Sequence, residues 1–176
     1  SGAALDPAGK EGLASMMAGL LEEGAGDLDS RAFQQRLADI SVTLRFDASL
    51  DTFEGGLKTL TENRGEAFSL LRIALNAPRF DAEPVERIRN QILAGLAAAE
   101  SDPAQIADKV WFRTAFPDHP YGRPVEGTRS GIAAVTANDL HGFIERRFGR
   151  DHLIIGVAGD ITAEELTPLL DSTFGS

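Results

Sequence analysis

The residues of this chain that can do chemistry are few and scattered. With no cysteine, its zinc-binding side chains are carboxylates and three histidines, His119, His141 and His152. A protein zinc site needs about three converging ligands, and no spacing links these histidines as a recognised pair. His119 lies in a loop rich in proline and glycine, between residues 117 and 128. We therefore predict that 119–122 is a structural loop and that the histidines hold no metal.

Other candidates for catalysis or cofactor binding are equally isolated. Glu22 and Glu23 are adjacent, but neighbouring helical residues point about 100° apart, so we interpret them as a solvated helix end. Ser15 has no histidine or lysine near it in the sequence that can activate it as a nucleophile. The run Gly156–Asp160 lacks the third glycine of a dinucleotide-binding loop and reads as a strand end with a turn. No catalytic residue and no cofactor-binding residue is predicted.

The composition predicts one soluble globular domain. The 176 residues are 43% hydrophobic and 25% charged. The net charge of −10 disfavours nucleic acid and anionic lipid; it suits a basic peptide or serves solubility alone. No apolar run approaches the roughly 18 residues of a membrane span. The compartment, periplasmic or cytoplasmic, is left undecided.

Hydrophobic periodicity predicts an α+β fold, with a mixed or antiparallel sheet and helices packed on one face. Ile40–Asp47 and Thr52–Thr59 alternate as two strands of a hairpin around 49–51, and the unbroken apolar run Leu153–Ala158 is typical of a strand buried on both faces. Helical patterns cover about 10–23, 30–39, the segment before Pro78, 82–101, 103–116, 136–148 and the residues after Thr162. Capping side chains are expected at Asp29 or Ser30, Asp102, Thr136 and Thr162.

Three stretches carry a resemblance to a known family: Leu5–Ala14, Pro78–Arg89 and His119–Thr128. Together with Gly156–Asp160, they resemble the pitrilysin/insulinase family of metallopeptidases, and in particular its inactive bacterial members. The family also includes the mitochondrial processing peptidase and core subunits of a respiratory complex. The resemblance covers nearly the whole chain.

The same alignment predicts that the zinc site is lost. In the family motif H-x-x-E-H, two histidines bind zinc and the glutamate activates water. These positions hold Ser15, Ala18 and Gly19. A third ligand, a glutamate on a later helix, corresponds to Gly95, and a second glutamate two turns earlier corresponds to Ile88. The resemblance therefore implies a domain with no metal, no cofactor and no catalysis of its own.

Two departures from the family limit the domain assignment. Family domains begin with strands before the region of Leu5, and the proteins have a second, similar half. We expect residues 1–176 to be a single metallopeptidase-like domain without its N-terminal strands. An open sheet edge then favours self-association.

The resemblance implies a non-catalytic domain that pairs with a zinc-bearing domain or subunit around a peptide, so that the assembly is proteolytic. An exposed strand edge can bind such a peptide by strand addition. An alternative from a different class is a structural or assembly subunit without a peptide substrate, similar to the respiratory core proteins. A third, an enzyme with unrelated chemistry, has no convergent residues to support it.

Overall fold

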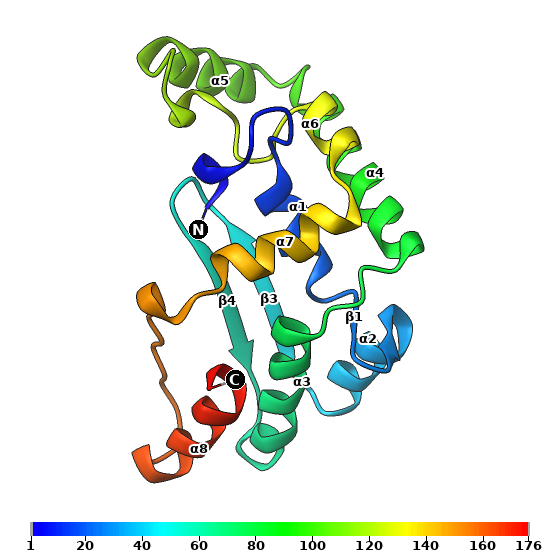
Figure 1. Cartoon of the computed structure of the whole chain (residues 1–176), viewed down its shortest axis with the longest axis vertical. Helices are drawn as coiled ribbons and strands as arrows, with labels where there is room; N and C mark the ends of the chain where they lie inside the picture. Colours follow the sequence, from blue (N-terminus) through cyan, green and yellow to red (C-terminus); the bar gives the residue numbers. More distant parts are fainter. Residues whose placement is uncertain (1, 176) are drawn as a thin grey trace.

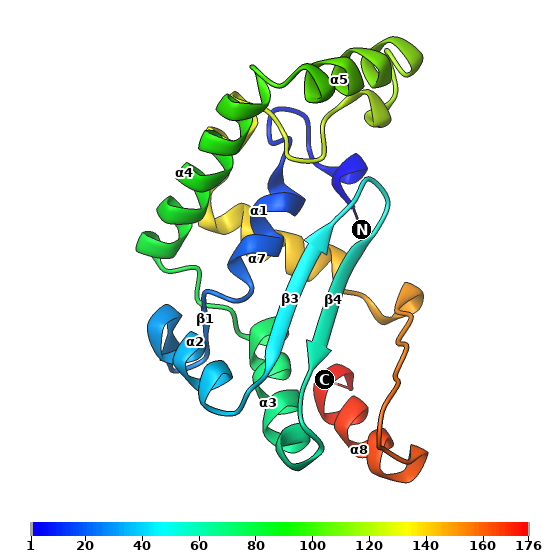
Figure 2. The ribbon, with the colours of Figure 1, turned by 180° about the vertical axis from the view of Figure 1, so that it is seen from behind.

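The computed structural model describes residues 2–175, which form an α+β fold. Its main sheet is an antiparallel hairpin of β3 (Thr43–Ala48) and β4 (Phe53–Lys58), in register from Thr43–Lys58 to Ala48–Phe53. Leu44 and Ala48 are buried, whereas Thr43, Arg45 and Asp47 are exposed. The helices lie behind one face of the hairpin and leave the other open (Figure 2). The predicted hairpin and its one-sided helical layer are confirmed.

A short central helix, α1 (Leu13–Leu20), organises the core. It contacts β3, α4 (Ala82–Ala99), α6 (Arg129–Ala134) and α7 (Ala137–Arg147). Both views place it between the hairpin and these helices (Figures 1 and 2). Met16 and Met17 are fully buried, which is the packing role that thioether side chains commonly have.

The remaining elements surround this core. The helices are α2 (Ser30–Asp39), α3 (Arg64–Asn76), α5 (Pro103–Ala115) and α8 (Ala163–Phe174). A second, two-residue ribbon pairs β1 (Gly24–Ala25) with β2 (Leu28–Asp29). Single turns of 3-10 helix are η1 (Ala3–Leu5), η2 (Thr61–Asn63), η3 (Pro120–Gly122) and η4 (Arg150–His152). Asp29, Asp102, Thr136 and Thr162 cap α2, α5, α7 and α8, as predicted.

Two element boundaries differ from the prediction because of left-handed backbone. α1 begins at Leu13 rather than near Lys10, since Gly12 has φ 99° and ends the preceding turn. β3 begins at Thr43 rather than Ile40. Ser41 has φ 54°, and the Val42 N–H donates to the Leu37 carbonyl, so that these residues terminate α2.

The predicted buried strand Leu153–Ala158 is wrong. The segment joins no sheet, and the exposed fractions of Leu153, Ile154 and Val157 are 44%, 94% and 47%. It runs on the β4 side of the hairpin in both views (Figures 1 and 2). An apolar run becomes a buried strand only when neighbouring strands cover it, and residues 2–175 supply none there.

Candidate functional site

Two of the positions that the family resemblance assigns to the zinc site, Gly19 and Ile88, meet at the contact between α1 and α4. A Cβ atom added at Gly19 would lie 3.0 Å from Cγ2 of Ile88. Ile88 and Ala18 are buried, and Ser15 is half-buried. The structure thus brings Gly19 and Ile88 together, and the contact between them is hydrocarbon. These residues do not fit a zinc ion, which needs imidazole, thiolate or carboxylate ligands.

The other metal-ligand candidates lie apart from this contact. Gly95 is exposed on α4, with open space where a Cβ would be. His119 accepts a hydrogen bond from the Tyr121 N–H and caps η3, so the predicted loop has a structural role. His141 packs its ring against Phe80, with ring centroids 5.0 Å apart. Across residues 2–175, no three histidine, aspartate or glutamate side chains gather as metal ligands.

Glu23, just after α1, is engaged in an ion pair. Arg87 on α4 donates to its carboxylate at 2.6 Å, and the Ser30 hydroxyl donates at 2.5 Å. The hydrogen bond from Arg87 is the main reason that the pKa of Glu23 lies below its usual value. The solvated helix end predicted for this residue is therefore wrong, because α4 covers it.

Glu22 turns the other way, toward β3. Burial raises its pKa, and the backbone amide of Phe46 and the charge of Arg45 oppose that rise only in part. It has no ion pair within 4.0 Å among the residues that the structure describes. The two adjacent carboxylates thus face different neighbours, as helical spacing predicts, but Glu22 is half-buried rather than solvated.

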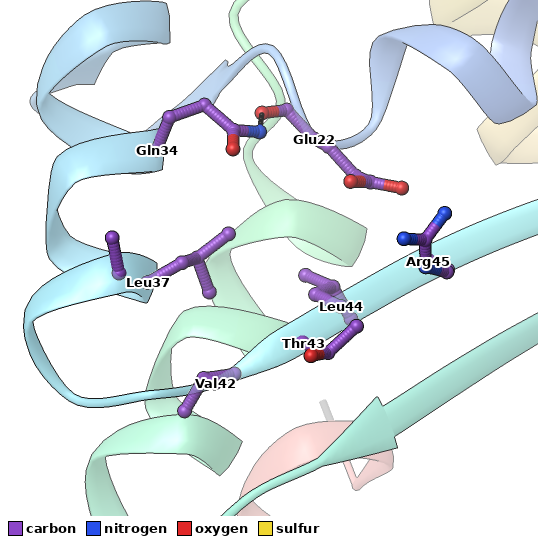
Figure 3. Close-up of a pocket in the computed structure, with 8 residues that line it drawn as sticks. Glu22, Gln34, Leu37, Val42, Thr43, Leu44 and Arg45 are labelled. Carbon is purple, nitrogen blue, oxygen red and sulfur yellow. Dashed lines mark hydrogen bonds between the residues drawn. The ribbon is translucent and has the colours of Figure 1, made fainter.

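An open depression of about 240 Å³ lies beside Glu22, between α2 and β3 (Figure 3). Its apolar part comes from Leu37, Ala38, Val42 and Leu44. Gln34 lies across from Glu22 and donates from its side-chain amide to the Glu22 carbonyl at 2.8 Å. Leu37, Val42 and Leu44 are buried and expose little to this depression, and its polar lining comes from Glu22, Gln34, Thr43 and Arg45.

The free edge of β3 adjoins this depression. The Ser49 N–H donates to the Thr52 carbonyl at 2.9 Å, which makes Ser49–Thr52 a hydrogen-bonded pair of the hairpin. Such pairs alternate along an antiparallel ladder, so Asp47, Arg45 and Thr43 also bond to β4. The backbone groups of Leu44 and Phe46 consequently face away from β4. Within residues 2–175 no further strand pairs with that edge.

This arrangement can bind an extended chain but offers no recognisable catalytic set. The sequence predicted an exposed strand edge but not that β3 carries it, and the depression next to β3 was not identified. The available signal was a glutamate that follows directly after the apolar run Met16–Leu21, where a polar side chain must find a partner or water.

Comparisons with known proteins confirm the resemblance to pitrilysin-like peptidases. No protein-family model matches the chain. Over 171 residues, covering 97% of this chain and 40% of the relative, it is 27% identical to the non-peptidase homolog YmxG of Helicobacter pylori. Over 104 residues, covering 59% of this chain and 23% of the relative, it is 34% identical to an uncharacterized zinc protease of Mycobacterium leprae. The chain spans less than half of the length of either relative.

Solved structures also show the resemblance to pitrilysin-like peptidases. The peptidase M16 inactive domain from Pseudomonas fluorescens is 26% identical and superposes with a TM-score of 0.76 over 81% of this chain and 35% of its own. Pitrilysin is 20% identical, and its TM-score of 0.83 over 99% of this chain and 19% of its own shows a shared fold. No helix within residues 2–175 has both the length and the apolar character needed to cross a membrane.

Proposed function

We propose that this chain, similar over nearly its whole length to pitrilysin-like peptidases, is a non-catalytic domain that pairs with a zinc-bearing domain or subunit. The two would close around an unfolded peptide, which the zinc-bearing partner cleaves. The observation that carries the proposal is the Gly19–Ile88 contact. The family resemblance assigns both residues to the lost metal site, and hydrocarbon rather than zinc ligands fills the contact between them.

A structural subunit without a peptide substrate is the alternative. It also accounts for the loss of ligands, but it gives no role to the free edge of β3 or to the depression beside Glu22. An unpaired edge is a site for strand addition, in which backbone hydrogen bonds hold an extended peptide. This feature supports the peptide-binding proposal.

Reconstitution tests the proposal. The chain alone should cleave no unfolded peptide, and adding it to its zinc-bearing partner should raise the rate of cleavage severalfold. The control reaction contains the same amount of this chain after heat unfolding, returned to the assay temperature before it is added. A partner that works equally well without this chain supports the structural alternative.

We also propose that strands from outside residues 1–176 complete the sheet in the whole protein. On β4, the ladder that begins at Ser49–Thr52 leaves the backbone groups of Phe53, Gly55 and Leu57 facing outward. The exposed apolar run 153–157 lies on the same side of the hairpin.

Residues 1–176 on their own should therefore self-associate, most simply as a symmetric dimer, since pairing covers both the open backbone and the apolar side chains. Light scattering across a dilution series from high to low micromolar concentration measures this. A compact monomer at every concentration would show that the chain protects its own edge.

A further inference from the structure

We infer that α5 docks this chain onto its zinc-bearing partner through an apolar face formed by Ile106, Ala107, Val110 and Trp111. The inference rests on the proposed pairing function and adds the surface at which the two bodies meet. All of α5, from Pro103 to Ala115, is exposed, so this helix contributes no buried residue to the core.

The apolar face of α5 is open to solvent. At about 100° per residue, its four members point to one side of the helix. The exposed fractions of Ile106, Val110 and Trp111 are 44%, 49% and 60%. A helix of 13 residues is marginal in water by itself and owes its stability to the packing of an apolar face. The open face therefore predicts a partner surface that covers it in the whole protein.

A series of aromatic contacts holds α5 on the body of the chain and positions Trp111. The Phe116 ring, just after α5, lies 5.6 Å from the Tyr121 ring of η3, and Phe112 stacks on Phe116 at 6.3 Å. Phe112 in turn meets the Trp111 ring edge-on at 4.9 Å. The Tyr121 hydroxyl donates to the Asp51 carboxylate at 2.7 Å, which ties η3 to the turn between β3 and β4. Trp111 is thus fixed in place while most of its side chain stays exposed, as an interface anchor requires.

The other incomplete surface of the molecule does not account for this face. Strands from outside residues 1–176 are proposed to add beside β4, and the dimer proposed for residues 1–176 uses the same side. Both views place α5 at one end of the molecule, whereas the segment 153–157 runs toward α8 at the other end (Figures 1 and 2). The apolar face of α5 therefore lies apart from the proposed sheet contacts and needs an occupant of its own.

The length of the relatives favours a second domain as this occupant. The chain matches 40% of YmxG, so more than half of that relative lies outside the matched region, which is enough for a second domain of similar size. A second domain or subunit is also the partner that the proposed function requires. A large apolar patch on the surface of a soluble domain is typical of such a contact.

The border of the apolar face indicates the chemistry of the partner surface. Lys109 and Arg113 follow Ile106 at i+3 and i+7, so the two cations lie along one side of the face. Glu100 pairs with Arg129 at 2.9 Å rather than with nearby Lys109, and within residues 2–175 neither cation has an ion pair shorter than 4.0 Å. We therefore expect a partner surface that is apolar opposite Trp111 and carries carboxylates opposite the two cations.

The single tryptophan of the chain allows a direct test. Residues 1–176 are prepared with fluorotryptophan, which places one fluorine label at position 111. The probe is a pitrilysin-like chain of the same organism that retains an intact H-x-x-E-H motif. Fluorine NMR during titration with this probe gives the signal shift of residue 111 and the dissociation constant. The forms compared are wild type, Val110→Glu and the control Leu60→Glu, at an apolar residue that is 51% exposed outside α5. Glutamate has a higher helix propensity than valine, so Val110→Glu keeps α5 helical.

On binding, the fluorine signal should shift in wild type and in Leu60→Glu, with equal dissociation constants. In Val110→Glu the dissociation constant should rise about tenfold or more, because a carboxylate enters an apolar interface. An equal constant in all three forms, or a signal that stays in place while the probe binds, overturns the α5 surface but leaves the proposed function standing. A signal that shifts with the concentration of the chain alone assigns the face to a second copy and also overturns the inference. If the probe binds none of the three folded forms, the proposed pairing is itself wrong.

Discussion

Replacing Asp6 with alanine should lower the free energy of unfolding by about 3–5 kcal/mol, the usual cost of removing one partner from a buried ion pair. The Asp6 side chain is 1% exposed and lies 3.3 Å from Nη1 of Arg147 on α7. It also accepts hydrogen bonds from the Gly12 N–H at 3.0 Å and the Ala14 N–H at 3.2 Å. One carboxylate thus satisfies the start of α1 and ties it to α7.

The variant leaves a largely buried guanidinium and two backbone N–H groups without this acceptor. Arg147 also donates to the Gly2 and Leu5 carbonyls, so the N-terminal segment should loosen with it. Urea denaturation measures the loss, with Asp118→Ala, at an exposed loop position, as the matched control. A loss below about 1 kcal/mol for Asp6→Ala would mean that water replaces the carboxylate at little cost.

A variant with a rebuilt zinc motif should show the second large effect, a loss of stability with little gain in zinc binding. The variant Ser15→His, Ala18→Glu, Gly19→His and Gly95→Glu restores the residue types of the family motif, although residue 95 is exposed and lies apart from the Gly19–Ile88 contact. We expect weak zinc binding at best and a loss of stability. The new Cβ at residue 19 would lie only 3.0 Å from Ile88, and overpacking of this kind typically costs about 1–3 kcal/mol. Groups that orient the ligands are also expected to be absent.

Adding Ile88→Ala to these four changes separates the two causes of weak zinc binding, which are overpacking against Ile88 and the absence of groups that orient the ligands. It removes the methyl group that blocks residue 19, so the five-fold variant should bind zinc better than the four-fold one. Isothermal titration with zinc, next to a thermal melt of each variant, gives both quantities. Tight zinc binding by the four-fold variant would contradict the account, because it requires that Ile88 moves away freely and that the geometry has survived.

Local sequence patterns predicted the helices and the hairpin well. The helix Ser30–Asp39 and its cap Asp29 follow from adjacent residues, as does the capping of α7 by Thr136. Such features depend on backbone propensity and on hydrogen bonds between near neighbours. The apolar run Leu153–Ala158 failed because a strand also needs a partner, which no local pattern supplies.

Contacts between distant residues could not be predicted from the residues alone. The Asp6–Arg147 pair joins opposite ends of the chain, and both partners look like ordinary surface residues in sequence. Glu22 and Glu23 read as a solvated helix end, yet α4 supplies Arg87 to one and β3 covers the other. The contact of Gly19 with Ile88 was not predicted; the family resemblance only assigned each residue to a position of the lost zinc site.

The central claim is that this domain has lost its metal, and the zinc content of the wild-type chain tests it most directly. The protein is purified without chelator, dialysed against metal-free buffer and measured by elemental analysis against its concentration. Because the family resemblance assigns the ligand positions to Ser15, Gly19 and Gly95, none of which is a good zinc ligand, we expect far less than one zinc per chain. About one tightly held zinc per folded chain would contradict the account.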